Sequence, residues 1–249
     1  MFSGYYTIAS GLLANQRNVE TIGNNLINSQ TPGYRAERIV NSAFEQELMT
    51  RRDSSGNTVL GDGIGATAVV VDDSLTVYNP GLIKETGSSF DVAINGEGFF
   101  NIRGADGKTY LTRSGEFDMD REGYLIMPGV GRVLGKSGEI LVRTSDITIK
   151  EDGTIMNSAG NVLGQLHITA PEDYSTLERT ENGLFISEAP LNDSNNFQLL
   201  QNNLELSNVQ MNTELTNLIA AQRALQNCAS ALKTVDSLNR KAATQIAAI

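Results

Sequence analysis

Apolar residues recur at helical spacing at both ends of the chain and at strand spacing between the ends. Near the start they step alternately four and three residues apart, the heptad repeat of helices that pack against one another. The same steps run from Met211 to about Ile246, after Ser207 and Asn208, whose side chains can cap a helix. The spacing therefore predicts two heptad helices that bracket the chain, the second about 35 to 40 residues long.

The two predicted seams have similar composition. The first runs through Ile8, Leu12, Asn15, Val19, Ile22 and Leu26, and the second through Met211, Leu215, Leu218, Gln222, Leu225, Ala229 and Leu232. The helices could bury these narrow stripes against each other or against neighbouring copies of the chain, and periodicity alone leaves both possibilities open.

Between the helices, short runs of β-branched, aromatic or alternating residues predict strands. These runs are Ala66–Val71, Leu75–Tyr78, Phe90–Ile94, Phe99–Ile102, Tyr124–Met127, Ile147–Ile149, Val162–Thr169 and Leu184–Ser187. Four breaks, at 105–108, 121–123, 151–153 and 181–183, place glycine where a hairpin turn needs positive φ. We expect an all-β domain of hairpins and, for the whole chain, an α+β fold whose terminal helices form a coiled-coil-like bundle.

These patterns divide the 249 residues into four expected segments. Residues 1–35 hold the N-terminal helix and an asparagine-rich stretch, 36–80 an extended connector, 81–200 the central β domain and 201–249 the C-terminal helix. A chain of this length can form one fair-sized domain or two small ones.

The net charge of −10 lies in the middle of the chain, because residues 36–200 carry 13 basic and 25 acidic side chains. This balance disfavours nucleic acid and anionic membrane as partners. No apolar run is long enough to span a bilayer. The first positive side chain is Arg17, so we expect no cleavable secretory signal.

Three stretches resemble ligand-binding motifs but have the wrong spacing or context. Gly131–Ser137 has three residues between its glycines where a phosphate-binding loop needs four. Asp118–Gly123 begins like a calcium loop, but its twelfth position is Gly129, so we interpret it as an acidic hairpin turn. Gly61–Gly65 leads into a predicted strand, whereas a dinucleotide fingerprint leads into a helix.

The one histidine and the one cysteine of the sequence are the remaining candidates for catalytic or metal-binding residues. His167 is the one histidine, and its place in an alternating strand favours a packed or half-exposed side chain. Cys228 has no second cysteine, so an intramolecular disulfide is excluded and a small buried residue is expected. A nucleophilic dyad and a histidine-rich metal site are nearly excluded, and no carboxylate pair is singled out. We expect no cofactor, no metal and no enzymatic activity.

Three longer blocks of the chain have distinctive patterns. In "ASGLLANQRNVETIGNNLINSQTPGYRAE" a helix ends in an asparagine-rich stretch and Thr-Pro-Gly-aromatic. The other two are "FDVAINGEGFFNIRGADGKTYLTRSGEFDMDREGYLI" and "LELSNVQMNTELTNLIAAQRALQNCASALKTVDSLNRKA". In this order they resemble the N-terminal signature, the core β segment and the C-terminal helix of the rod and hook family of bacterial flagellar axial proteins. The blocks occur in the family's order and cover about half the chain. The length and the β domain fit the proximal or distal rod proteins best.

The resemblance implies a structural subunit of the flagellar basal-body rod, polymerised through its terminal helices into a hollow axial drive shaft. The implied partners are copies of itself, other rod and hook proteins and the flagellar type III export apparatus, which would pass a largely unfolded chain. The alternative is an oligomeric β module that binds cell-wall glycan or another protein, with the helices serving only for oligomerisation. The absence of tryptophan speaks mildly against carbohydrate stacking.

The resemblance to rod proteins suggests a hypothesis for the asparagines of the first helix. Buried amides limit the register and the partners of a helix, so we expect Asn15, Asn24, Asn25 and Asn28 to pair with helices of neighbouring subunits. In the next segment Pro32 ends the helix, Gly33 permits a turn and Tyr34 offers an aromatic anchor against a neighbour. The strands of residues 36–80 are expected to pair between subunits.

Overall fold

A computed structural model describes residues 2–52, 58–180, 182–194 and 196–246. The chain divides into two compact units that interleave along the sequence. The helix–hairpin unit holds residues 1–27, 37–77 and 210–249, and the β unit holds residues 28–36 and 78–209. Both ends of the sequence therefore belong to one unit, and the chain passes between the units several times.

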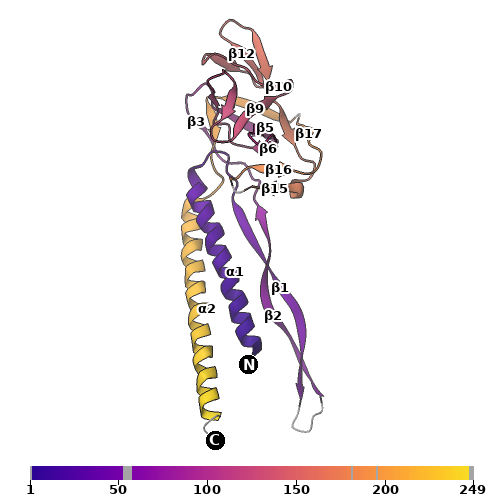
Figure 1. Cartoon of the computed structure of the whole chain (residues 1–249), viewed down its shortest axis with the longest axis vertical. Helices are drawn as coiled ribbons and strands as arrows, with labels where there is room; N and C mark the ends of the chain where they lie inside the picture. Colours follow the sequence, from indigo (N-terminus) through magenta and orange to yellow (C-terminus); the bar gives the residue numbers. More distant parts are fainter. Residues whose placement is uncertain (1, 53–57, 181, 195, 247–249) are drawn as a thin grey trace. The chain divides into compact units, whose positions relative to one another are not determined.

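Two helices and one hairpin build the helix–hairpin unit. The helices are α1 (Phe2–Ile27) and α2 (Met211–Ile246), and the strands β1 (Glu37–Arg52) and β2 (Thr58–Thr76) pair antiparallel with each other. Figure 1 shows α1 and α2 side by side and antiparallel, with the N-terminus of α1 nearer the C-terminus of α2. The paired terminal helices, together with the β-sheets described below, confirm the predicted α+β fold. The half-buried stripes of the two helices contact each other within one chain.

Helix α1 contacts α2 on one side and the hairpin on another. Asn15 lies on the side of α2, because its amide is 3.7 Å from the Cys228 sulfur. Asn25 lies on the side of the hairpin, where it bonds the backbone of Glu37. The helix therefore needs two inward faces, and this explains why polar and small residues interrupt its apolar seam.

The β unit consists of short antiparallel strands, of which the described residues form one ten-stranded sheet and several smaller ones. In the large sheet the order is β15-β16-β6-β5-β9-β8-β7, with β10 on β9 and β14 on both β5 and β17. The smaller sheets are β11-β12-β13, β18-β4 and β19-β3. The elements are η1 (Asn28–Gln30), β3 (Ile83–Glu85), β4 (Val92–Gly96), β5 (Phe99–Gly104), β6 (Thr109–Thr112), β7 (Asp118–Met119), β8 (Leu125–Met127), β9 (Gly131–Gly135), β10 (Gly138–Glu139), β11 (Ile147–Ile149), β12 (Thr154–Asn157), β13 (Val162–Gln165), β14 (Ile168–Ala170), η2 (Tyr174–Thr176), β15 (Leu177–Arg179), β16 (Phe185–Ser187), β17 (Asn192–Asp193), β18 (Phe197–Gln201) and β19 (Asn203–Glu205).

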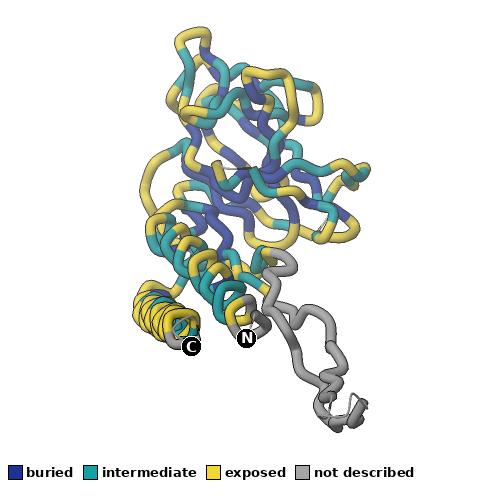
Figure 2. Tube along the Cα trace, turned by 60° about the horizontal axis from the view of Figure 1, so that its bottom comes forward, coloured by how far each residue is buried: buried dark blue, intermediate teal, exposed yellow. Residues whose placement is uncertain are grey.

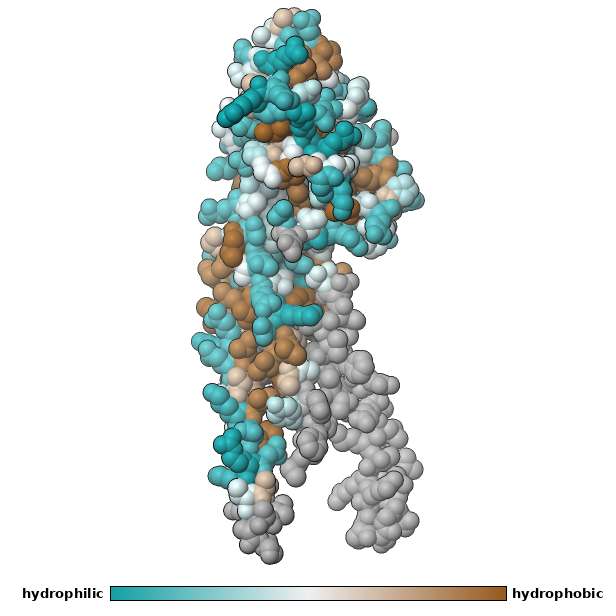
Figure 3. All heavy atoms as spheres, in the orientation of Figure 1, coloured by the Kyte–Doolittle hydropathy of each residue, from teal (hydrophilic) through white to brown (hydrophobic). Residues whose placement is uncertain are grey.

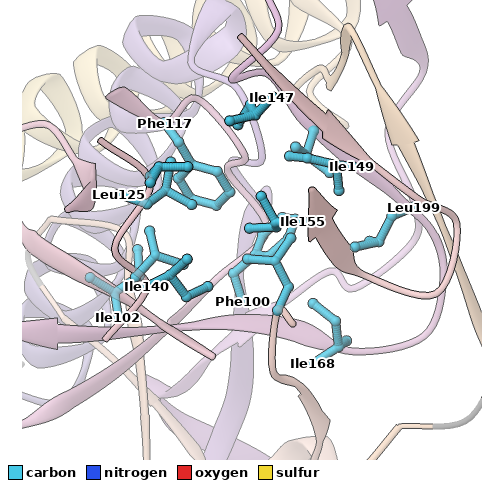
Figure 4. Close-up of a cluster of buried hydrophobic side chains, with 14 of the residues drawn as sticks. Phe100, Ile102, Phe117, Leu125, Ile140, Ile147, Ile149, Ile155, Ile168 and Leu199 are labelled. Carbon is cyan, nitrogen blue, oxygen red and sulfur yellow. The ribbon is translucent and has the colours of Figure 1, made fainter. Parts of the chain in front are cut away.

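Strand β5 lies at the centre of the β unit, with a hydrophobic cluster on each face. Successive side chains of a strand point to opposite faces, so Phe100 enters one cluster and Phe99 the other. The larger cluster draws on several sheets, as Figure 4 shows, and Phe100 meets Phe117 edge to face at 5.0 Å between ring centroids. Buried residues concentrate in this unit, whereas most described positions of the helices are half-buried or exposed (Figure 2).

The predicted turns and strands can be compared directly with this unit. Gly107, Gly123, Gly153 and Gly183 all have positive φ, between 75° and 90°, as the four hairpin turns require. The single strand predicted over Val162–Thr169 is two strands, because the chain changes partner at His167. There β13 pairs with β12, while β14 pairs with β5 and β17.

Truncating the central aromatic residue of the core tests its contribution to stability. We expect Phe100→Ala to lower the free energy of unfolding by about 3 to 5 kcal/mol, because it leaves a cavity in a fully buried cluster. The measurement is guanidinium unfolding followed by circular dichroism. Val162→Ala, at an exposed position on β13, is the control and should change the same quantity by less than about 0.5 kcal/mol. Equal effects of the two variants would contradict this assignment of the core.

Candidate functional site

The signature segment at residues 28–36 belongs to the β unit rather than to the helix that precedes it. After η1, Gly33 takes φ +69°, and its backbone N–H donates to the Glu205 carbonyl at 2.7 Å. A Cβ at this position would lie 2.1 Å from the Ser114 backbone nitrogen. The turn predicted at Gly33 therefore needs glycine twice, for the positive φ and for the close approach of the backbone of Arg113 and Ser114, just after β6.

Tyr34 packs inside its own chain. Its side chain is 6% exposed, and the Arg179 guanidinium lies over its ring at 4.4 Å from the centroid. The same guanidinium donates through Nη1 to the Arg35 carbonyl at 2.8 Å. The aromatic anchor expected to face a neighbouring subunit thus finds a cation in the same chain, and little of its ring is left for another molecule.

A buried ion cluster follows directly after Tyr34. The Glu205 carboxylate receives Arg35 Nη2 at 2.7 Å on Oε1 and lies 3.2 Å from Arg113 Nε through Oε2. All three side chains are at most 6% exposed. Arg113 also donates to the carbonyls of Gly96 and Gly98, and its burial lowers the pKa of its guanidinium while the Glu205 charge opposes that shift. One carboxylate therefore balances two buried cations.

Asn208 ties together the three backbone segments beside this cluster. Its Oδ1 accepts from the Ala36 N–H at 2.7 Å, and its Nδ2 donates to the Asn79 carbonyl at 2.9 Å. Glu205 Oε1 makes a similar link by accepting from the Gly81 N–H at 2.9 Å. We call the set Gly33, Arg35, Ala36, Glu205 and Asn208 the clamp.

Sequence reasoning identified Gly33 in the clamp but missed the charged residues. The local sequence carries little signal, because Glu205 stands between Leu204 and Leu206 but the next residues on either side, Asn203 and Ser207, are polar. Nothing nearby identifies its partner as Arg35, which lies at the other end of the chain.

All six seam positions predicted on α1 are half-buried in the chain: Ile8, Leu12, Asn15, Val19, Ile22 and Leu26. On α2 the predicted positions divide. Leu218, Leu225, Ala229 and Leu232 are half-buried, whereas Met211, Leu215 and Gln222 are exposed.

The half-buried positions of α2 also include residues outside the predicted seam: Ala221, Cys228 and Val235. Cys228 lies close to Gly11 and Asn15 of α1. Periodicity predicted the repeat but placed exposed Gln222, rather than half-buried Ala221, on the seam.

The predicted amides make contacts within their own chain. Asn25 is 1% exposed and pairs with the Glu37 backbone twice, as donor to the carbonyl at 2.8 Å and as acceptor from the N–H at 2.9 Å. Asn15 donates to the Gly11 carbonyl at 2.8 Å. Asn24 is exposed on α1, and Asn28 is half-buried and accepts from the Thr31 hydroxyl.

Large apolar side chains also remain exposed on the helices. On α2, Met211, Leu215 and Ile219 follow one another at intervals of four residues and form a ridge that we call the apolar ridge. On α1, Leu13 and Ile27 are 61% and 79% exposed. Figure 3 shows apolar residues gathered along the helices, with polar residues toward the C-terminal end of α2. Such a concentration on helices is typical of a protein–protein interface.

The motif-like stretches have ordinary structural roles. Gly131–Gly135 is strand β9, and Asp120 Oδ1 in the acidic turn accepts from the backbone of Glu122 and Tyr124. His167 is half-buried and bonds Asp193 at 2.8 Å, which lowers the pKa of that carboxyl. Across the described residues, no group of three or more potential ligands is arranged to hold a metal. In the same residues, no helix has the length and apolar character of a membrane span.

Three family models match successive parts of the chain. Residues 6–35 match the flagella basal body rod protein model, residues 93–157 the flagellar hook protein FlgE/F/G D1 domain and residues 200–246 the flagellar basal body rod FlgEFG protein C-terminal model. Flagellar basal-body rod protein FlgG of Agrobacterium fabrum is 32% identical over 92% of this chain and 94% of its own length. The chain belongs to the flagellar basal-body rod protein family.

Other rod proteins also match this chain over nearly its whole length. Flagellar basal-body rod protein FlgF of Caulobacter vibrioides is 29% identical over the whole of both chains, and FlgG of Bacillus subtilis is 27% identical over 96% of this chain and 97% of its own. The family is structural, so membership confirms the expectation that the chain is not an enzyme. Membership also implies a place in the basal-body rod and assembly with other rod subunits.

The two reasons for glycine at position 33 can be separated by a matched pair of substitutions. Gly33→Ala should lower the free energy of unfolding of the β unit by about 2 to 5 kcal/mol, since it combines a left-handed backbone with displacement of the Arg113–Ser114 backbone. Gly87→Ala is the control, because Gly87 has φ +80° but nothing within 4 Å of its Cβ position. The control should cost only about 1 to 2 kcal/mol. Equal losses in guanidinium unfolding would show that the close approach contributes nothing.

The paired bonds of Asn25 predict a local effect on the hairpin. Asn25→Ala removes both partners of the Glu37 backbone, so we expect a loss of about 2 kcal/mol and faster amide exchange at Glu37. Asn227→Ala, exposed on α2, should leave both quantities unchanged within about 0.5 kcal/mol. Hydrogen exchange with mass spectrometry measures the difference, and unaltered exchange at Glu37 in the first variant would contradict the bonding.

Proposed function

We propose that this protein is a structural subunit of the flagellar basal-body rod that polymerises through its terminal helices into the hollow axial drive shaft. The observation that carries the proposal is the apolar ridge, which stays exposed although α1 and α2 already bury their seams against each other. A surface of this kind is stabilised by a further partner. Family membership supplies the partners, namely copies of the chain and other rod and hook proteins.

The predicted interface residues take two roles in this proposal. The half-buried seam of α1, with Leu218, Leu225, Ala229 and Leu232 of α2, holds the helix pair together within a subunit. Met211, Leu215 and Gln222, which are exposed on α2, contact the next subunit. Ile219 joins them because it continues the apolar ridge.

The signature residues contribute less directly to assembly. Gly33 and Tyr34 are buried in the β unit, and half-buried Pro32 precedes them, so they act by holding the signature segment rather than by facing a neighbour. Exposed Asn24 is the amide best placed to bond a neighbouring helix. Such a bond would limit register, because a desolvated amide needs a partner.

Export through the flagellar type III apparatus, without a cleavable signal peptide, completes the proposal. A chain that passes such an apparatus largely unfolded cannot depend on disulfides made beforehand, and a single cysteine meets that condition. The four predicted sequence segments fit this order, with a helix exported first, a connector and β domain next and the longer helix last.

A paired substitution on α2 tests the proposal. Leu215→Ala with Ile219→Ala should raise the concentration needed for polymerisation at least about tenfold, because burial of the removed methyl and methylene groups is lost at each subunit contact. The control, Lys233→Ala with Thr234→Ala, changes exposed polar residues of the same helix. Sedimentation and electron microscopy of concentrated protein measure assembly, and circular dichroism checks that both variants keep their helices.

The same variants can be tested in cells that carry no other copy of the protein. We expect the ridge variant to yield basal bodies without complete rods and cells that do not swim, while the control restores both. Complete rods and normal motility with the ridge variant would overturn the assignment of this surface.

A further inference from the structure

The clamp joins backbone segments that are distant in sequence. Ala36 and Asn208, 172 residues apart, are held by a hydrogen bond of 2.7 Å. The Arg179 bond to the Arg35 carbonyl spans 144 residues, and the Glu205 bond to Gly81 spans 124. Helix α1 ends at Ile27, shortly before the clamp, and α2 begins at Met211, shortly after it.

The charges of the clamp make its two sides unequal. Among the described residues, Arg35 has one carboxylate within ion-pair distance, and that carboxylate is Glu205. Glu205, in contrast, is also close to Arg113 and accepts from the Gly81 N–H. Removal of Arg35 thus leaves Glu205 with a cation, whereas removal of the Glu205 charge leaves two buried cations without an anion.

Docking of the signature segment consequently requires the end of the β unit. Gly33 donates to the Glu205 carbonyl, Arg35 pairs with the Glu205 carboxylate and Ala36 donates to Asn208. Without residues 203–208, a buried cation and two backbone donors would lose these partners, a large penalty away from water.

We propose that the clamp is a latch that closes only when the chain is complete through Asn208, and that its closure fixes the two points at which the chain enters and leaves the β unit next to the terminal helices. Arg35 and Glu205 are then positioning residues. Until Asn208 has docked, the open latch leaves the signature segment that follows α1 without these hydrogen-bond and ion-pair partners. The closed latch then holds that segment to residues 205–208, which precede α2 in the chain. The latch itself stands on the β unit alone, and only its use in rod assembly rests on the proposed function.

Because loss of Arg35 and loss of the Glu205 charge should have different effects, the two substitutions test the latch in the full chain. Arg35→Met should speed amide exchange of residues 28–36 at least tenfold and expose the Arg35-free segment to proteases, while exchange in β5 stays within twofold of wild type. Glu205→Gln should open the same segment and also speed exchange around Arg113. Glu178→Gln, exposed on β15, is the control for loss of one carboxylate and should change neither region.

Either of two results with Arg35→Met would overturn the latch. One is exchange of residues 28–36 within twofold of wild type, which would mean that the ion pair does not hold the segment. The other is equal acceleration in residues 28–36 and in β5, which would mean global destabilisation. The Arg35→Met variant alone is sufficient to test the latch, even if Glu205→Gln does not fold.

The dependence on a complete chain has its own measurement. In pulse-labelled refolding of the full wild-type chain, protection of residues 28–36 should appear together with or after protection of residues 203–209. Earlier protection of the signature segment would refute the order. Rod formation by Arg35→Met is measured in a separate experiment. An open latch in a protein that still forms rods, and a closed latch in a protein that does not, are then distinguishable results.

Discussion

The buried pair of Arg35 and Glu205 is the constraint on which the arrangement of the β unit depends. A charge withdrawn from water requires a partner of opposite sign and hydrogen bonds to its remaining polar atoms. The chain meets part of that requirement by bringing backbone from both of its halves to one carboxylate, while Arg35 Nε, Arg35 Nη1 and Glu205 Oε2 have no hydrogen-bond partner among the described residues. Gly33 and Gly81 follow from this crowding, because a Cβ at either position would lie about 2 Å from a backbone atom of another segment.

Local patterns in the sequence predicted local structure well. Glycines 107, 123, 153 and 183 occupy the turns that their neighbours indicated, and α2 runs over Met211–Ile246 as its heptads and the Ser207 and Asn208 region suggested. These features depend on residues only a few positions apart, so a short window contains their cause. The family resemblance, which spans both ends and the middle, was likewise readable and is confirmed.

Long-range pairing could not be read in the same way. The polar residues around Leu204, Glu205 and Leu206 do not indicate a buried ion pair, and only the fold selects Arg35 over the other basic residues. The phase of α2 is a second case, since Ala221 and Gln222, or Cys228 and Ala229, satisfy the same repeat. The asparagines are a third, because Asn25 is a helix residue whose bonding partner is the backbone of a strand. A polar residue within a helical apolar pattern thus indicates that the helix has a second contact surface. It does not indicate whether the same chain or another molecule supplies the partner.

The position of Cys228 has a practical consequence for work on the helices. It is the one thiol in the sequence, and it lies half-buried on α2 beside Gly11 and Asn15 of α1. The rate at which a thiol reagent modifies the native protein therefore changes when the packing of the two helices around this sulfur changes. No engineered label is needed, and the same atom can be followed in dilute subunits and in the assembled polymer, which makes the wild-type chain its own sensor of helix pairing.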